Sequence, residues 1–260
     1  MMKNRYGMAM YTVQRAVAED MHAAFARLAG LGYESIEFYG DMTFEPEKIR
    51  KAIADSGLRY VGWHVEWRDL QPETIEKTVA YLKACGCPVA IIPCLGSHWQ
   101  IGHTEDQECR EVWVEHLKDM IRIQQRLKKD DIRTGYHNHA HEFELSYDGK
   151  KLYDFLFDQL PEDFILEFDS GNCIEGGDDP LRVLTKYKDR DMILHMKPYS
   201  RTRGFDIMLG DEDDANDWPA YLDPALRKPY LAMLVESENR QATEWENAAQ
   251  CMEYLKGERK

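Results

Sequence analysis

The feature that most constrains the fold of this chain is a unit of one short apolar strand and one amphipathic helix, repeated along the sequence. Strands are predicted over residues 6–13, 33–40, 58–67, 88–95, the first part of 133–145, 164–172, 191–199 and 230–239. Helices are predicted between them, the first over residues 20–29, before Gly30, and the second between Pro46 and Gly57. Eight strands that alternate with helices at intervals of about 30 residues predict an α/β fold, a single (β/α)8 TIM barrel.

Length, composition and charge narrow the class of protein further. With 260 residues, 43% of them hydrophobic, and no linker or low-complexity segment, the chain can bury one large core, so a single domain over residues 1–260 is expected. The formal net charge of −14 argues against nucleic acid and anionic membranes as partners, because both attract basic surfaces. No apolar run has the length of a signal peptide or a membrane span, and the six cysteines form no C-x-x-C pair. A cytoplasmic protein with free thiols is therefore expected.

Polar side chains recur where the predicted strands end. They are Glu37, His64, Glu66, Glu167, Asp169, His195, Lys197, Glu236 and Glu238. In a barrel of this kind, the C-terminal ends of the strands meet at one face, where catalytic groups gather. Buried unpaired carboxylates are costly, so this many converging charges predict a divalent cation as counter-charge. Asp, Glu and His ligands without cysteine suit Mn²⁺, Mg²⁺, Co²⁺ or Zn²⁺, and the alternative is a set of salt bridges at the barrel rim.

The densest polar group follows the fifth predicted strand, in the segment RTGYHNHAHEFEL at residues 133–145. Within six positions this segment holds His137, Asn138, His139, His141 and Glu142. Imidazole and carboxylate groups hold divalent metals and transfer protons. The segment is therefore predicted to contribute to a functional site, and the alternative is a surface loop that is rich in histidine.

Seven stretches carry a resemblance to a known family. They are MYTVQ, LGYESIEFYG, VGWHVEW, GYHNHAHEFE, LEFDSGN, ILHMKPY and VESEN, and together they extend over almost the whole chain. In this order they resemble the sugar phosphate isomerase/epimerase family, the xylose isomerase-like TIM barrels. The most specific elements are YHNH-x-x-EF, the Asp-Ser-Gly turn and His-x-Lys.

The resemblance implies one divalent metal ion, with Mn²⁺ expected ahead of Mg²⁺, Co²⁺ or Zn²⁺. Carried over by position, the metal ligands are Glu142, Asp169, His195 and Glu236. Relatives with a simpler fifth strand have their glutamate nearer His137, so His137 or His139 is an alternative to Glu142. Residues implied to bind substrate are Glu37, His64, Lys197 and Asn172, and Asn172 stands where many relatives have histidine.

The implied chemistry begins with removal of a proton next to a carbonyl group, and the metal stabilises the resulting enediolate as a Lewis acid. The candidate catalytic residues are Glu142, Glu236, His137 and His139. We therefore expect a metal-dependent isomerase or epimerase of a sugar or keto-sugar. The alternative is a lyase, dehydratase or hydratase that acts on a 3-keto-glycoside or an inosose, because loss of a β-leaving group shares the first step.

Two other classes are remote alternatives. An endonuclease IV-like enzyme would use the same barrel, but it needs a basic groove, and the charge of −14 argues against one. A non-catalytic barrel without metal is the other. The expected partner is a small sugar substrate. Relatives are often dimers or tetramers, so the resemblance also allows a homo-oligomer.

Overall fold

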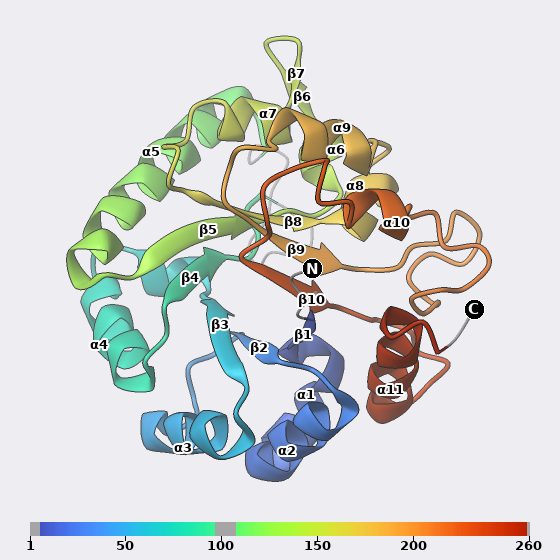
Figure 1. Ribbon diagram of the computed structural model, residues 1–260. Coiled ribbons are helices and arrows are strands. Elements are labelled where there is room, and N and C mark those ends of the chain that lie inside the picture. Colours follow the sequence, from blue (N-terminus) through green and yellow to red (C-terminus); the bar gives the residue numbers. More distant parts are fainter. Residues whose placement is uncertain (1–5, 97–107, 259–260) are drawn as a thin grey trace.

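The computed structural model describes residues 6–96 and 108–258, in which eight parallel strands close into a barrel (Figure 1). The strands are β1 (Tyr6–Ala9), β2 (Ser35–Tyr39), β3 (Arg59–His64), β4 (Val89–Ile92), β5 (Arg133–His137), β8 (Ile165–Asp169), β9 (Met192–Met196) and β10 (Ala232–Val235). Barrel strands that follow one another in the chain pair with each other, and β1 pairs with β10 in the register Tyr6↔Met233. The predicted (β/α)8 barrel is confirmed. The single domain predicted over residues 1–260 includes residues 1–5, 97–107 and 259–260, which lie outside the described residues.

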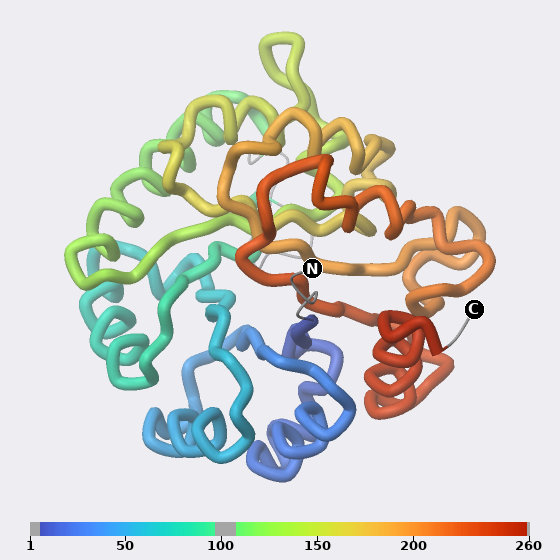
Figure 2. Tube along the Cα trace, viewed as in Figure 1, coloured from blue at the N-terminus to red at the C-terminus, as the bar shows by residue number. Residues whose placement is uncertain are grey.

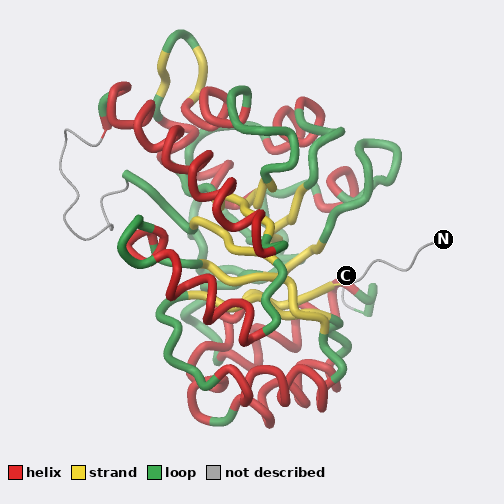
Figure 3. Tube along the Cα trace, turned by 90° about the vertical axis from the view of Figure 1, so that its left-hand side faces the viewer, coloured by secondary structure: helices red, strands yellow, loops and turns green. Residues whose placement is uncertain are grey.

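Helices surround the barrel. They are α1 (Gln14–Glu19), α2 (Met21–Leu31), α3 (Pro46–Ser56), α4 (Ile75–Cys85), α5 (Arg110–Leu127), α6 (His141–Glu144), α7 (Leu152–Phe157), α8 (Ser170–Glu175), α9 (Pro180–Lys186), α10 (Trp218–Tyr221) and α11 (Glu244–Leu255). The chain runs once around the barrel, so that α11, red in Figure 2, packs against the blue α2. Figure 3 shows the barrel strands in the interior, with helices above and below them in that view. A small hairpin of β6 (Ser146–Tyr147) and β7 (Lys150–Lys151) projects from this ring.

Two predictions from the sequence concern membrane spans and cysteines. Among the described helices, none combines the length and the apolar composition that a membrane crossing requires. All six cysteines lie in the described ranges and none forms a disulfide, which agrees with the prediction of free thiols.

Local capping signals explain where elements begin and end. The Asp20 side chain accepts a hydrogen bond from the Ala23 backbone N–H at 3.0 Å and so starts α2. The helix predicted over residues 20–29 continues through Gly30 to Leu31 and ends at Gly32, whose φ of 107° is left-handed. A glycine inside a helix costs only about 1 kcal/mol, so Gly30 does not stop the helix.

Most of the predicted strands are shorter in the structure, and helical turns replace the C-terminal ends of those predicted over residues 6–13 and 164–172. Residues 10–13 form a 3-10 turn after β1, and α8 begins at Ser170, directly after β8. The prediction of strand over residues 170–172 is wrong, because Asp169 accepts a hydrogen bond from the Asn172 N–H at 2.8 Å and caps α8. Gly171 permits this turn, since a Cβ there would lie 2.6 Å from the Lys197 carbonyl oxygen.

The interior of the barrel changes from apolar to polar along the strand direction. A separate apolar cluster fills its first part, formed by Val61, Val89, Ile91, Ile165, Ile193, Ala232 and Leu234. Residues two apart on a strand share a face, so Ile165 is followed on the same face by Glu167 and Asp169. β9 and the end of β10 repeat this order with His195 and Glu236. The strands therefore place a buried polar layer on an apolar one, at the C-terminal end of the barrel.

Candidate active site

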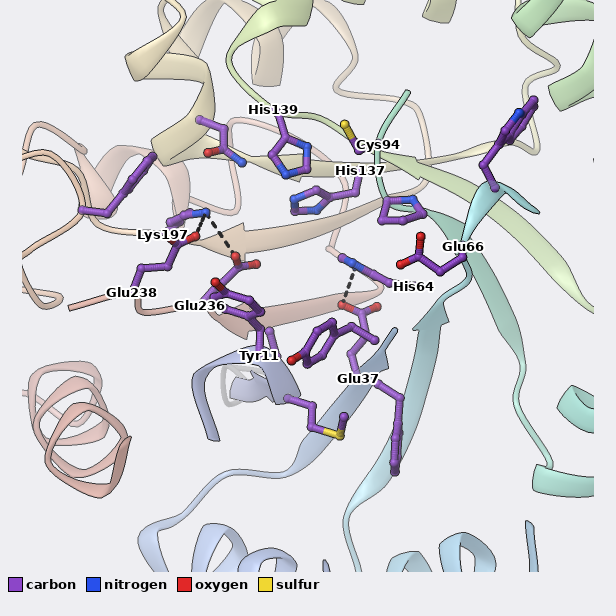
Figure 4. Close-up of a pocket in the computed structure, with 18 of the residues that line it drawn as sticks. Tyr11, Glu37, His64, Glu66, Cys94, His137, His139, Lys197, Glu236 and Glu238 are labelled. Carbon is purple, nitrogen blue, oxygen red and sulfur yellow. Dashed lines mark hydrogen bonds and ion pairs between the residues drawn. The ribbon is translucent and has the colours of Figure 1, made fainter. Parts of the chain in front are cut away.

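A cavity of about 960 Å³ opens at the C-terminal ends of the strands (Figure 4). Polar side chains in its wall include Glu37, His64, Glu66, His137, His139, Asn172, Lys197, Glu236 and Glu238. Aromatic side chains in its wall are Tyr11, Phe38, Tyr39, Trp67 and Phe205. A concave site that combines aromatic walls with a few convergent polar groups is typical of sites for small molecules.

Four buried side chains form a cluster in this region that we call the outer group: His137, Asp169, His195 and Glu236. They come from β5, β8, β9 and the residue after β10, and one donor atom of each lies within 4.8 Å of the others. His195 Nδ1 lies 2.7 Å from Glu236 Oε2, and His137 Nε2 lies 4.0 Å from Asp169 Oδ2. Barrel closure thus brings together residues that are up to 99 positions apart, from 137 to 236.

The outer group fits a divalent metal ion by its chemistry. Asp169 is fully buried, and its Oδ2 atom has no hydrogen-bond partner among the described residues. A buried acceptor without a partner is rare in native proteins and calls for a ligand or a water molecule. Two imidazoles and two carboxylates without a thiolate suit hard to borderline cations such as Mn²⁺, Mg²⁺, Co²⁺ or Zn²⁺.

Glu142, which was predicted to be a metal ligand and a catalytic residue, lies outside the outer group. It belongs to the short helix α6, and its fully buried carboxylate accepts hydrogen bonds from the Tyr136 hydroxyl and from the His139 backbone N–H. Its Oε1 atom also lies 3.0 Å from His141 Nε2. The β5 position in the group is occupied by His137, which the sequence analysis had kept as the alternative.

A second set of side chains that could hold a cation contains His64, His137, Glu167 and His195, so it shares His137 and His195 with the outer group. We call its remaining members His64 and Glu167, together with Glu37, the inner group. Glu167 precedes Asp169 by two residues on β8, so it lies one step further into the barrel. The His64 ring bonds Glu167, and its Nε2 atom lies 3.3 Å from Glu37 Oε2. Glu37 and His64 were predicted to bind substrate, whereas Glu167 was predicted only to lie at the end of a strand, with no assigned function. Both glutamates are almost fully buried, with 2% and 0% exposure.

Lys197 supplies a positive charge beside the outer group. Its Nζ atom lies 3.1 Å from Glu236 Oε1 and 2.5 Å from Glu238 Oε1, and Figure 4 shows it facing both glutamates. The same ammonium lies 4.5 Å from the centre of the Phe205 ring. Only 3% of Lys197 is exposed, so these carboxylates compensate a buried charge.

The surroundings set the charge state of each group. Burial alone would raise the pKa of Glu236, but Lys197 and His195 hold it well below its usual range. Burial raises the pKa of Asp169 to about 7, although Lys197 opposes the shift. Burial and neighbouring imidazoles keep the pKa of His137 well below its usual value. His137 is therefore neutral near pH 7, which is the form that binds metals.

Asn138 is a structural partner of the site that a search for titratable residues misses. Its side-chain oxygen accepts a hydrogen bond from the Asp169 N–H at 3.0 Å, and its Nδ2 donates to the Asp169 carbonyl at 3.1 Å. Asn172, which lines the cavity, donates from its Nδ2 to the Asn138 carbonyl at 3.1 Å. The amide between the two histidines of the HNH motif thus ties β5 to the turn that carries Asp169.

Comparisons with known proteins agree with this fold. The family model for the xylose isomerase-like TIM barrel matches residues 25–257. A sugar phosphate isomerase/epimerase from Parabacteroides distasonis ATCC 8503 superposes with a TM-score of 0.76 at 23% identity, covering 98% of this chain and 94% of that one. A D-allulose 3-epimerase from Methylomonas sp. superposes with a TM-score of 0.67 at 13% identity, covering 98% of both chains.

A curated relative is similar over a shorter span. An inosose dehydratase from Geobacillus kaustophilus (strain HTA426) is 23% identical over 187 residues, which is 66% of this chain. The match spans 60% of the length of that relative.

Proposed function

The chain belongs to the xylose isomerase-like TIM barrel family, and we propose that it is a divalent-metal-dependent isomerase or epimerase of a sugar or keto-sugar. The observation that carries the proposal is the outer group of His137, Asp169, His195 and Glu236 beside the cavity of about 960 Å³. Hydroxyl-rich substrates need donors and acceptors on several sides, and titratable side chains from β2, β3, β5, β9 and β10, or from the residues just after these strands, line this cavity.

In the proposed mechanism the four residues of the outer group would hold the ion, with Mn²⁺ ahead of Mg²⁺, Co²⁺ or Zn²⁺. A bound divalent cation supplies Lewis-acid stabilisation of negative charge on a carbonyl oxygen. Glu236, which Lys197 and His195 keep ionised, removes the proton from the neighbouring carbon to give an enediolate. Return of the proton from Glu236 to the other carbon gives isomerisation, whereas epimerisation requires a second acid that protonates the first carbon from its opposite face.

His139 is proposed to exchange a proton with a substrate oxygen. Its ring lies in the cavity wall near His137, with ring centres 5.0 Å apart. Burial keeps the pKa of His139 well below its usual value, and the nearby Lys197 acts in the same direction. A neutral imidazole can accept a proton at one nitrogen and donate at the other, as this step requires.

A dehydratase that acts on an inosose is the second candidate, and the match to an inosose dehydratase favours it. The first step would be the same, but a β-hydroxyl would then leave with a proton from His139. The two reactions are separable in D₂O. Isomerisation or epimerisation places deuterium on carbon without loss of water, whereas elimination produces an unsaturated ketone that absorbs in the ultraviolet.

Removal of the metal is expected to abolish turnover of the keto-sugar that the chain converts in a substrate screen. Without the cation, Asp169 and Glu236 would lack a shared counter-ion and the enediolate would lack its Lewis acid. Mn²⁺ should restore turnover, because carboxylate and imidazole ligands suit this ion. Metal analysis and turnover are measured on the same chelator-treated and reloaded samples. Full activity in a metal-free sample would overturn the proposed function.

Substitutions of His137 and His139 should separate a metal ligand from a proton donor. His137→Gln should lower metal occupancy and turnover together. His139→Gln should retain the metal and lower turnover by ~10²-fold or more, as loss of a general acid or base does. Occupancy and turnover are measured for both variants. If both quantities stay unchanged in both variants, the HNH segment has no part in the site.

A further inference from the structure

We propose that Glu37 and Glu167 of the inner group are positioning residues, which determine the nitrogen that His195 and His137 present to the outer group. The inference rests on the proposed function, because it concerns imidazoles that are proposed to hold a cation. In this proposal the two glutamates orient the metal-binding imidazoles. Glu37 was instead predicted to bind substrate, and no function was predicted for Glu167.

The His195 ring lies between carboxylates of the outer group and carboxylates of the inner group. Its Nδ1 atom lies 2.7 Å from Glu236 Oε2 in the outer group. Its Nε2 atom lies 2.7 Å from Glu37 Oε2 and 3.3 Å from Glu167 Oε1 in the inner group. One nitrogen of this ring therefore faces each group.

The His137 ring is divided in the same way but with its nitrogens exchanged. Its Nδ1 atom lies 3.1 Å from Glu167 Oε1. Its Nε2 atom lies 4.0 Å from Asp169 Oδ2, the buried oxygen without a hydrogen-bond partner among the described residues. The ring centres of His137 and His195 are 4.7 Å apart with an interplanar angle of 68°, so the two rings meet edge to face where they bridge the inner and outer groups.

Hydrogen-bond chemistry then determines the tautomers. A neutral imidazole carries one N–H donor and one free lone pair, and an ionised carboxylate only accepts. Glu37 therefore accepts a hydrogen bond from the Nε2–H of His195, and a cation in the outer group would replace the proton that Nδ1 shares with Glu236 in the metal-free protein. Glu167 holds the proton of His137 on Nδ1 and leaves Nε2 free. The two ligand rings would be opposite tautomers, each oriented by its own inner carboxylate.

His64 explains how two carboxylates can stay buried at this depth. Its ring contacts Glu167, and its Nε2 atom is 3.3 Å from Glu37 Oε2. The His64 and His195 rings stack with centres 5.5 Å apart and an interplanar angle of 20°. Since a buried charge needs a partner, His64 stabilises the inner glutamates, which in turn orient the ligand rings.

The test compares Glu37→Gln and Glu167→Gln with the control Glu238→Gln, whose carboxylate lies 2.5 Å from Lys197 Nζ and is not part of the outer or the inner group. The dissociation constant for Co²⁺ is measured by titration of its visible absorption. Removal of a carboxylate that supports a ligand histidine typically weakens metal binding ~10–100-fold, and we expect this loss in both inner variants. The control should bind Co²⁺ as the parent does.

Histidine ¹⁵N NMR of the Zn²⁺-loaded parent gives a second test that needs no variant. The proposal expects the N–H of His195 on Nε2 and that of His137 on Nδ1. Parent-like Co²⁺ affinity in both inner variants, or the opposite tautomers in the parent, would overturn the proposal. The proposed function would still stand if Asp169→Asn lost the metal. A parent chain that binds neither ion would overturn both.

Discussion

Glu236→Gln is expected to lower turnover by ~10²–10⁴-fold, the range that a general acid or base contributes. Glu236 is the residue that we propose both to hold the cation and to remove the proton. Its carboxylate lies 2.7 Å from His195 Nδ1 in the outer group and 3.1 Å from Lys197 Nζ beside it, so it contacts both a proposed metal ligand and the buried lysine. Glutamine preserves the size of the side chain but removes its charge and most of its basicity. Turnover and metal content are measured on the purified variant.

The matched control is Glu238→Gln, which removes the other glutamate that contacts Lys197. Glu238 has a side chain that is 23% exposed, and it does not belong to the outer group. Its substitution should therefore reduce turnover much less. Equal losses in the two variants would mean that the Lys197 ion pairs matter and that Glu236 has no separate catalytic role.

Lys197→Met is expected to destabilise the metal-free protein by up to ~3–5 kcal/mol, the cost of removing one partner from a buried ion pair, because only His195 then remains to compensate Glu236. The lysine is 3% exposed and compensates Glu236 and Glu238. Substrate binding or turnover should also fall strongly, while the metal content of the loaded protein is retained. Urea unfolding of the metal-free form measures the first effect, and kcat, KM and metal analysis of the loaded form measure the second.

Lys186→Met is the control for this experiment. Lys186 also pairs with two carboxylates, Asp154 at 3.1 Å and Asp158 at 2.9 Å, but its side chain is 35% exposed. Partly exposed pairs of this kind contribute about 0.2–1 kcal/mol, so the loss should be several times smaller. If the two lysine variants unfold alike and Lys197→Met keeps full turnover, Lys197 is a rim ion pair outside the site.

The repeat of strand and helix in the sequence was sufficient to predict the barrel, because both periodicities are local. Alternation along β8 was also sufficient to place Glu167 and Asp169 on one face, and strand ends in a closed parallel barrel must meet. Residues as distant as Glu37 and Glu236 could therefore be assigned to one region before any contact was known. The cavity wall contains both of them.

Local sequence could not show where each strand stops. The segment after Phe164 continues the apolar pattern, but the Asp169 cap turns the chain into α8. The segment after His137 likewise turns into α6, which directs Glu142 to Tyr136 and away from the outer group. Such turns depend on hydrogen bonds that compete with the strand ladder, and composition alone does not decide that competition.

The sequence by itself thus determined the barrel and the set of polar residues at its C-terminal end, because these follow from periodicity and from closure of the sheet. Only the tertiary structure decided how that set divides into an outer group beside Lys197 and an inner group around His64. It also decided that each nitrogen of His137 and His195 faces a different carboxylate. Those arrangements depend on side-chain orientation between strands that are far apart in the chain, where no local pattern of residues can specify them.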